Sequence, residues 1–148
     1  MFSGKVNWHG GMCFEGTSGS NHKIMMDTGK EMGGTGRGAR PTEILLMSLA
    51  GCSGIDVVHI LEKMHLTIDE FAVSVEGDRA ATEPKFFTEI RLLYSLKGTA
   101  LTQEKVERAI RLSQEKYCSI ANNLNKVSRI VFAYELNGER YPKEGWMA

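Results

Sequence analysis

The N-terminal quarter of the chain has the pattern of a β-hairpin followed by a glycine-rich loop. Apolar and polar residues alternate from Lys5 to Phe14, as expected of a half-buried strand. The run Gly-Thr-Ser-Gly-Ser-Asn at 16–21 is typical of a turn, and residues 23–26 are predicted to return as a short second strand. Residues 27–40 contain five glycines, so we expect a mobile loop there.

A long helix is predicted from Pro41, which suits a first helical position, to about Met64. One stripe of this helix comprises Leu45, Leu49, Cys52, Asp56 and His59. The adjacent arc is apolar as well, so one sheet cannot cover all of the helix. A second buried surface is needed, and a homodimer is its simplest source.

The second half of the chain predicts two strands, a second long helix and a last strand. The strands cover residues 71–76 and 86–96, and Thr102 is the N-cap of a helix that continues to about Leu124. The last strand is 129–136, and the tail 137–148 is expected to be a loosely held extension. Because single helices separate the strand pairs, we expect antiparallel hairpins and an α+β fold.

Composition narrows the class of protein. A chain of 148 residues fits a single domain, 1–148, with a sizeable core. Eighteen basic residues balance eighteen acidic ones, which argues against nucleic acid and anionic membranes as partners. We find no apolar run as long as a membrane span and no signal peptide, so a cytoplasmic location is expected.

The cysteines are the candidates for chemistry. There are three, Cys13, Cys52 and Cys118, with no C-x-x-C spacing, which argues against a disulfide framework and a structural zinc site. The histidines lack ligand spacing too, so neither a metal nor another cofactor is expected. Cys13 falls on the polar side of the first strand and is treated as incidental. Cys52 and Cys118 each lie on or beside the apolar stripe of a long helix, where they are either packing residues or reactive thiols.

Polar neighbours on the first helix leave this question open. Asp56 and His59 follow Cys52 by four and seven residues, which places them near its face. A carboxylate there disfavours the thiolate, so the thiol needs a cation, and Arg37 and Arg40 are the nearest arginines in sequence. A cysteine hydrolase with His59 as its base is the less favoured alternative, because seven residues rise about 10.5 Å along a helix.

Two blocks of sequence resemble the OsmC/Ohr family, and within it the branch of OsmC-related proteins typified by bacterial YhfA. The blocks are Arg-Pro-Thr-Glu-Ile-Leu-Leu-Met-Ser-Leu-Ala-Gly-Cys-Ser-Gly-Ile-Asp-Val-Val at 40–58 and Leu-Ser-Gln-Glu-Lys-Tyr-Cys-Ser-Ile at 112–120. The resemblance extends over nearly the whole chain to about residue 136. It implies an intertwined α+β homodimer in which two central helices each carry one cysteine.

The resemblance also implies a function. Characterised members are thiol peroxidases that reduce organic hydroperoxides, with dithiols, including lipoylated proteins, as reductants. The cysteine matching Cys52 attacks the peroxide, and the one matching Cys118 resolves it as a disulfide. The alternative is a non-enzymatic dimer of the same family that binds a small molecule or senses redox state with packing cysteines.

The activating residues depart from the family pattern. The family glutamate position after the proline is Thr42 here, and the carboxylate stands one residue later at Glu43. The family's activating arginine lies on N-terminal strands, but residues 1–36 contain no arginine. Arg37, Arg40 or a later residue such as Arg79 would have to serve as the activating arginine, with Glu43 as the acidic partner of that arginine. Ten helical residues span about 15 Å, so a completed site is expected to draw on both subunits.

Overall fold

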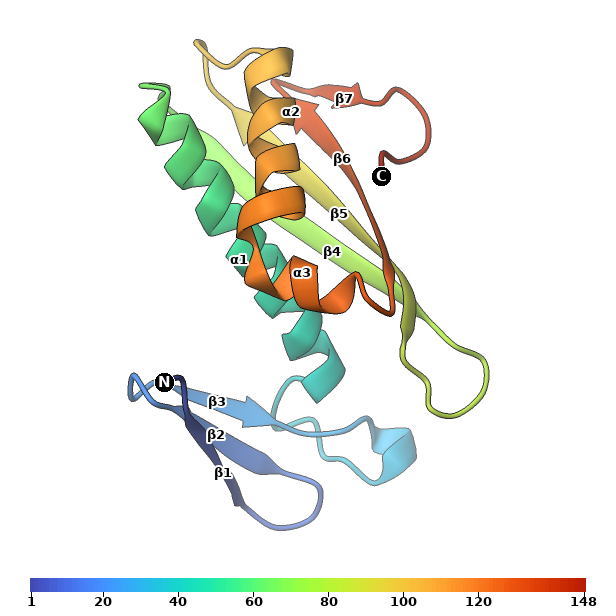
Figure 1. The fold of residues 1–148 in the computed structure, drawn as a ribbon. Helices are drawn as coiled ribbons and strands as arrows, with labels where there is room; N and C mark the ends of the chain where they lie inside the picture. The colour runs from blue at the N-terminus through green and yellow to red at the C-terminus, as the bar shows by residue number, and fades with distance from the viewer. The chain divides into compact units, whose positions relative to one another are not determined.

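The computed structural model describes all 148 residues, which form two compact units, Met1–Leu45 and Leu46–Ala148. Each contains one β-sheet, and the helices that follow the first sheet give a mixed α/β fold (Figure 1). The helix α1 (Pro41–Lys63) starts in the first unit and continues through the second. Its bounds agree with the sequence prediction to within one residue.

The first unit contains three antiparallel strands, in the order β1 (Gly4–Trp8), β2 (Phe14–Ser18) and β3 (Lys23–Met26). The single strand predicted from Lys5 to Phe14 is therefore wrong. Gly10 and Gly11 adopt φ of 89° and 57°, a left-handed turn that suits glycine, and Trp8 pairs with Phe14 across it. Cys13 lies in this turn and is buried rather than on a polar face.

The glycine-rich loop is held around one buried carboxylate. Asp27 accepts backbone N–H bonds from Thr28 at 2.8 Å and from Thr35 and Arg37 at 3.1 Å each. These donors, of which the Arg37 N–H has the largest effect, lower the pKa of Asp27 to about 2. The loop, with a short 3-10 turn η1 (Lys30–Met32), is thus ordered by Asp27, and the expected mobile segment has a defined anchor.

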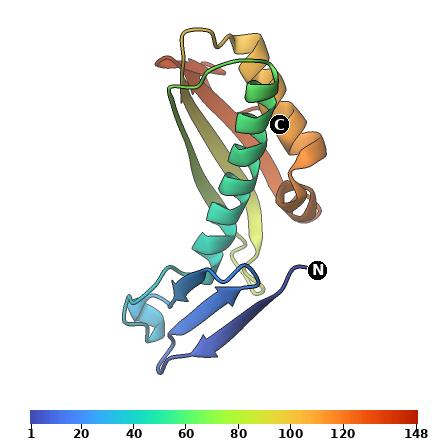
Figure 2. The same ribbon diagram turned by 90° about the vertical axis from the view of Figure 1, so that its left-hand side faces the viewer.

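The second unit places its helices against one face of a four-stranded sheet (Figures 1 and 2). The strands are β4 (Glu70–Arg79), β5 (Phe87–Lys97), β6 (Arg129–Leu136) and β7 (Glu139–Tyr141), in that order. Between β5 and β6 the chain forms α2 (Gln103–Leu112), the π-helical segment η2 (Ser113–Tyr117) and α3 (Ser119–Leu124).

Three expectations for this unit are corrected. β5 and β6 pair in parallel, because the helices between them carry the chain back to the start of the sheet. The second long helix is interrupted, with η2 and a break at Cys118 between α2 and α3. The tail is not loose, since β7 pairs with β6 and Met147 bridges to Phe132.

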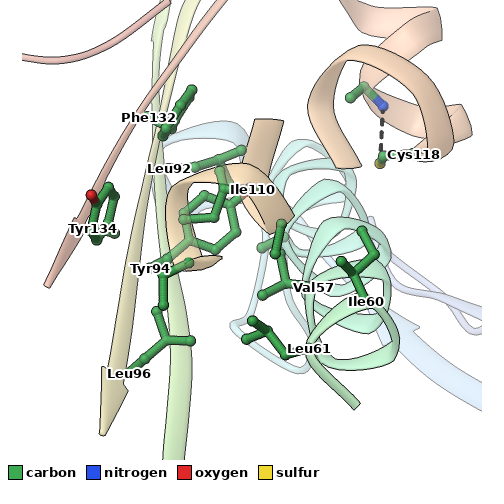
Figure 3. Packing of buried hydrophobic residues seen from close by; sticks show 14 of the residues in the cluster. Val57, Ile60, Leu61, Leu92, Tyr94, Leu96, Ile110, Cys118, Phe132 and Tyr134 are labelled. Carbon is green, nitrogen blue, oxygen red and sulfur yellow. Dashed lines mark hydrogen bonds between the residues drawn. The ribbon is translucent and has the colours of Figure 1, made fainter. Parts of the chain in front are cut away.

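The core of the second unit lies between α1, α2 and the sheet. Figure 3 shows Val57 and Leu61 of α1 with Ile110 of α2 facing Leu92 and Tyr94 of β5. These side chains have no more than 2% of their surface exposed, so they exclude water from the space where the helices meet. This packing fixes α1 and α2 side by side and positions the site described below.

By length and composition alone, α1 would be able to cross a membrane, which differs from the sequence expectation. Its most apolar window has a mean hydropathy of 1.9 and is 33% buried. One such helix is weak evidence for a membrane span, because the core helix of a soluble protein meets the same criteria.

Candidate functional site

The helix α1 presents two reactive side chains one turn apart. Cys52 and Asp56 are both half-buried and follow each other at i and i+4, so their side chains share a face. His59, one turn further, is exposed. Cys52 and Asp56 lie close to the second segment of the site, which comprises η2 and the following Cys118.

The break after η2 brings Cys118 to that face. The Cys118 N–H donates to the Ser113 carbonyl at 2.8 Å, a bond five residues back that defines the π-helical turn. Cys118 then takes an extended conformation and becomes the N-cap of α3. Its Sγ accepts the Ala121 N–H at 3.3 Å, the dashed line in Figure 3. The thiol is therefore held by α3 rather than on the flank of a continuous helix.

The two thiols and the carboxylate converge. Cys52 Sγ, Cys118 Sγ and a carboxylate oxygen of Asp56 all lie within 4.8 Å of one another. None of the three cysteines of the chain forms a disulfide. The structure thus brings together Cys52 and Cys118, which are 66 residues apart in sequence.

Exposure distinguishes the two thiols. Cys118 has none of its surface exposed, whereas Cys52 is partly accessible. Burial raises the pKa of the Cys118 thiol, the Ala121 N–H opposes this shift, and the adjacent Cys52 adds to it. A reagent from solution therefore meets Cys52 before Cys118.

A buried polar network lies directly behind the thiols and was not predicted. The Ser53 and Tyr94 hydroxyls share a hydrogen bond of 2.5 Å, and Gln114 Nε2 donates to both, at 2.9 and 2.6 Å. Ser113 Oγ lies 2.9 Å from Ser53 Oγ and donates to Asp56 Oδ2 at 3.0 Å. Desolvation raises the pKa of Tyr94, so this hydroxyl stays neutral.

This network fastens η2 to α1 and β5. In the sequence, Ser53 and Ser113 occupy inward positions on the apolar stripes of the two helices, and Tyr94 lies on one face of its strand. Serines at two such positions were the one available signal, because a buried hydroxyl needs a partner. Every buried side-chain polar atom in the structure has one.

The remaining predicted site residues belong to the first unit. The Arg37 guanidinium donates to the His9 carbonyl at 3.4 Å, and Arg40 forms an ion pair with Glu31 at 2.9 Å. Glu43 accepts the Arg40 N–H at 2.8 Å, as the acidic residue of a capping box does at a helix start. Their part in activating Cys52 stays a prediction. The alternative Arg79 donates to the Lys85 carbonyl at 2.6 Å.

A pocket opens beside the carboxylate of the site. It has a volume of about 450 Å³. Its lining comprises Asp56, His59, Ile60, Lys63, Met64, Leu112 and Tyr117. It is mostly apolar with a few polar groups, which suits a small organic molecule.

Comparison with known proteins agrees with this fold. The model of the OsmC-like protein family matches residues 34–132. Protein YhfA of Escherichia coli K12 is 39% identical over 133 residues, which are 89% of this chain and 96% of YhfA.

Solved structures of other proteins have a similar fold. A hypothetical protein from Aquifex aeolicus VF5 has a TM-score of 0.81 at 26% identity, covering 93% of this chain and 96% of that one. An organic hydroperoxide resistance protein OsmC from Legionella pneumophila has a TM-score of 0.71 at 19% identity, covering 91% and 96%, and shows the likeness of fold. Because the family model matches most of its length and YhfA is 39% identical to it, this chain belongs to the family of OsmC-like proteins.

Proposed function

We propose that this protein is a thiol-dependent peroxidase that reduces organic hydroperoxides with Cys52 and Cys118. The observation that carries the proposal is the contact of an accessible thiol with a buried one, within 4.8 Å. A pair of thiols from distant parts of the chain, held by a break in a helix, is the geometry that a disulfide cycle needs. The hydroperoxide resistance protein of Legionella pneumophila shares this fold.

The chemistry proceeds in two steps. The Cys52 thiolate attacks the terminal oxygen of the hydroperoxide; an S–O bond forms, the O–O bond breaks, and the alcohol leaves after taking a proton from solvent. The Cys118 thiol then attacks the resulting Cys52 sulfenic acid: the S–S bond forms, the S–O bond breaks, and the thiol proton leaves with the hydroxyl group as water. A dithiol, such as a lipoylated protein, returns two electrons and restores both thiols.

The first step needs a cation beside Cys52. The Asp56 carboxylate lies near both sulfurs and disfavours a second negative charge there. No guanidinium donates a hydrogen bond to either sulfur in the second unit. We assign the activating charge to Arg37 or Arg40, with Glu43 as acidic partner, and place the protein in the reducing cytoplasm.

The proposal includes a homodimer. A groove of about 630 Å³ runs between α1 and β4, and its walls include Gly51, Gly54, Phe71 and Val73. Met47 and Ile55 on the same helix are 50% and 72% exposed. A second copy is the occupant we propose, because the apolar circumference of α1 exceeds what one sheet covers and the family fold buries it between chains.

Thiol counting tests the proposed function. On adding cumene hydroperoxide to the reduced protein, we expect the loss of two of its three free thiols with release of the alcohol. Cys52→Ser should abolish the reaction, and Cys118→Ser should stop at a sulfenic acid that dimedone traps. The matched control Cys13→Ser should still lose two. The proposal fails if Cys52 and Cys118 both stay reduced at modest peroxide excess.

A small-molecule-binding or redox-sensing protein is the second candidate. The pocket that Asp56 and His59 line favours it, since such a volume holds an organic ligand without any reaction. Cys52→Ser separates the two functions. A binding protein keeps its ligand affinity in this variant, whereas a peroxidase loses turnover.

A further inference from the structure

The geometry points to a second use of the same side chains: Cys52, Asp56 and Cys118 form a binding site for a thiophilic divalent cation such as Zn²⁺. The inference does not depend on peroxidase activity. It rests on three donor atoms of two kinds that lie within 4.8 Å of one another. No metal was expected from the sequence, because neither the cysteines nor the histidines have ligand spacing. The three donors meet only in the folded chain, two from α1 and one from the start of α3.

The spacing of the donors fits a tetrahedral ion. Zn–S bonds of about 2.3 Å and Zn–O bonds of about 2.0–2.2 Å place neighbouring ligand atoms roughly 3.5–3.8 Å apart. Donors already within 4.8 Å of one another need only small rotations of their side chains to close on the ion. Two sulfurs and one carboxylate leave a fourth position for water, as in metal sites that keep an open coordination position.

Supporting hydrogen bonds orient the donors. The Ser113 hydroxyl donates to Asp56 Oδ2 at 3.0 Å, which leaves the other carboxylate oxygen available. The Ala121 N–H points at Cys118 Sγ and would support this sulfur as a thiolate. The network of Ser53, Tyr94 and Gln114 holds η2 in place behind both.

Charge favours a cation at this point. With both thiols deprotonated, the three ligands carry three negative charges, which is unfavourable in a partly buried site unless a cation is bound. Sulfur donors select Zn²⁺, Co²⁺ or Cd²⁺ over Mg²⁺ and Ca²⁺. Binding Zn²⁺ displaces one proton from each thiol.

Metal binding and the disulfide exclude each other. Reaction of the metal-bound dithiolate with one hydroperoxide and two protons gives the disulfide, the alcohol, water and free Zn²⁺, a two-electron oxidation. Oxidation of the two thiols thus releases the bound ion.

Cobalt spectroscopy tests the site. Reduced, chelator-treated protein should bind one Co²⁺ per chain, with sulfur-to-cobalt charge transfer and the visible bands of a tetrahedral ion, and Zn²⁺ should displace it. Asp56→Asn should weaken binding by at least 10–100-fold. Asp56→Cys should bind Co²⁺ with stronger charge transfer, since a third thiolate joins. Cys13→Ser should bind like the wild type, and Cys118→Ser should lose the charge-transfer signature of two sulfurs.

The outcomes separate this inference from the proposed function. Diamide should still form the Cys52–Cys118 disulfide in Asp56→Asn, which shows that the variant is folded. Unchanged Co²⁺ affinity in Asp56→Asn or Cys118→Ser, or a spectrum without sulfur charge transfer, would overturn the metal site. If two thiols are then still lost to hydroperoxide, the proposed peroxidase function is supported and the metal site is not. If Co²⁺ binds as expected but hydroperoxide leaves the thiols reduced, the metal site stands without the peroxidase.

Discussion

The hydroxyl of Tyr94 is predicted to support both the stability of the second unit and the placement of Cys118. It hydrogen-bonds to Ser53 at 2.5 Å and accepts from Gln114 at 2.6 Å, deep in the core. In Tyr94→Phe both bonds are lost, while the Ser53–Gln114 bond of 2.9 Å remains. Each buried bond contributes about 0.5–1.5 kcal/mol to the free energy of unfolding. Because the remaining Ser53–Gln114 bond still satisfies part of the network, the expected loss of stability is about 1–2 kcal/mol.

Urea denaturation at fixed protein concentration measures this loss. The midpoint should fall with an unchanged m-value, because the surface buried on folding stays the same. Tyr117→Phe is the matched control. Tyr117 is 51% exposed, and we expect its variant to stay within about 0.5 kcal/mol of the wild type. The rate at which Cys118 closes the disulfide should also fall in Tyr94→Phe, because Gln114 in η2 loses a tether. A midpoint equal to that of the control would refute the role given to this network.

Three further predictions concern other parts of the chain. The lowered pKa of Asp27, about 2 against 3.8, means that its contribution to stability is present above pH 3.8 and lost as the pH falls toward 2. Thermal melts of Asp27→Asn should therefore differ from wild type near pH 7 and converge with it near pH 2; a constant difference would contradict this. Removing residues 138–148 deletes β7 and Tyr141, whose ring stacks on that of Tyr134 at 5.3 Å between centroids. Urea unfolding should then show a loss of about 2 kcal/mol or more in the free energy of unfolding. No loss would indicate that the tail is loosely held. Gly51→Arg should convert the sedimenting species to monomer, because an added Cβ meets nothing within 4 Å in one chain but would enter the proposed dimer groove. Ser20→Arg, in an exposed turn, is its control and should leave the sedimentation unchanged.

The long regular elements were predictable from sequence. α1 follows from Pro41 at a helix start and an apolar stripe of helical period, and β6 from strict alternation over 129–136. The turn between β1 and β2 was missed for a geometric reason. Paired strand residues face the same side, and Trp8 and Phe14 are both even-numbered, so alternation continues unbroken across the loop.

Much of the site could not be predicted because it depends on a helix irregularity. Nothing in Ser-Gln-Glu-Lys-Tyr at 113–117 forbids a regular α-helix, and the choice of the π-helical turn depends on partners in α1 and β5. The family resemblance indicated that Cys52 and Cys118 belong together, but not that Cys118 caps a new helix. The proximity of Asp56 to Cys52 was predictable from their spacing on one helix, but its proximity to Cys118 follows only from the packed structure.

One electrostatic requirement links the proposed peroxidase and the proposed metal site. A Cys52 thiolate and the Asp56 carboxylate are two like charges close together, and a positive charge nearby would stabilise the pair. In the second unit, Arg91 is paired with Glu76, Asp78 and Glu89, and Arg111 with Glu107, so these guanidinium groups are already neutralised. The charge then has to come from a cation other than these two, such as Arg37, Arg40 or Arg79 of the same chain, from a second copy or from a bound ion. If it comes from a second copy, peroxidase activity per chain should fall on dilution below the dimer dissociation constant, and Zn²⁺ binding should persist there.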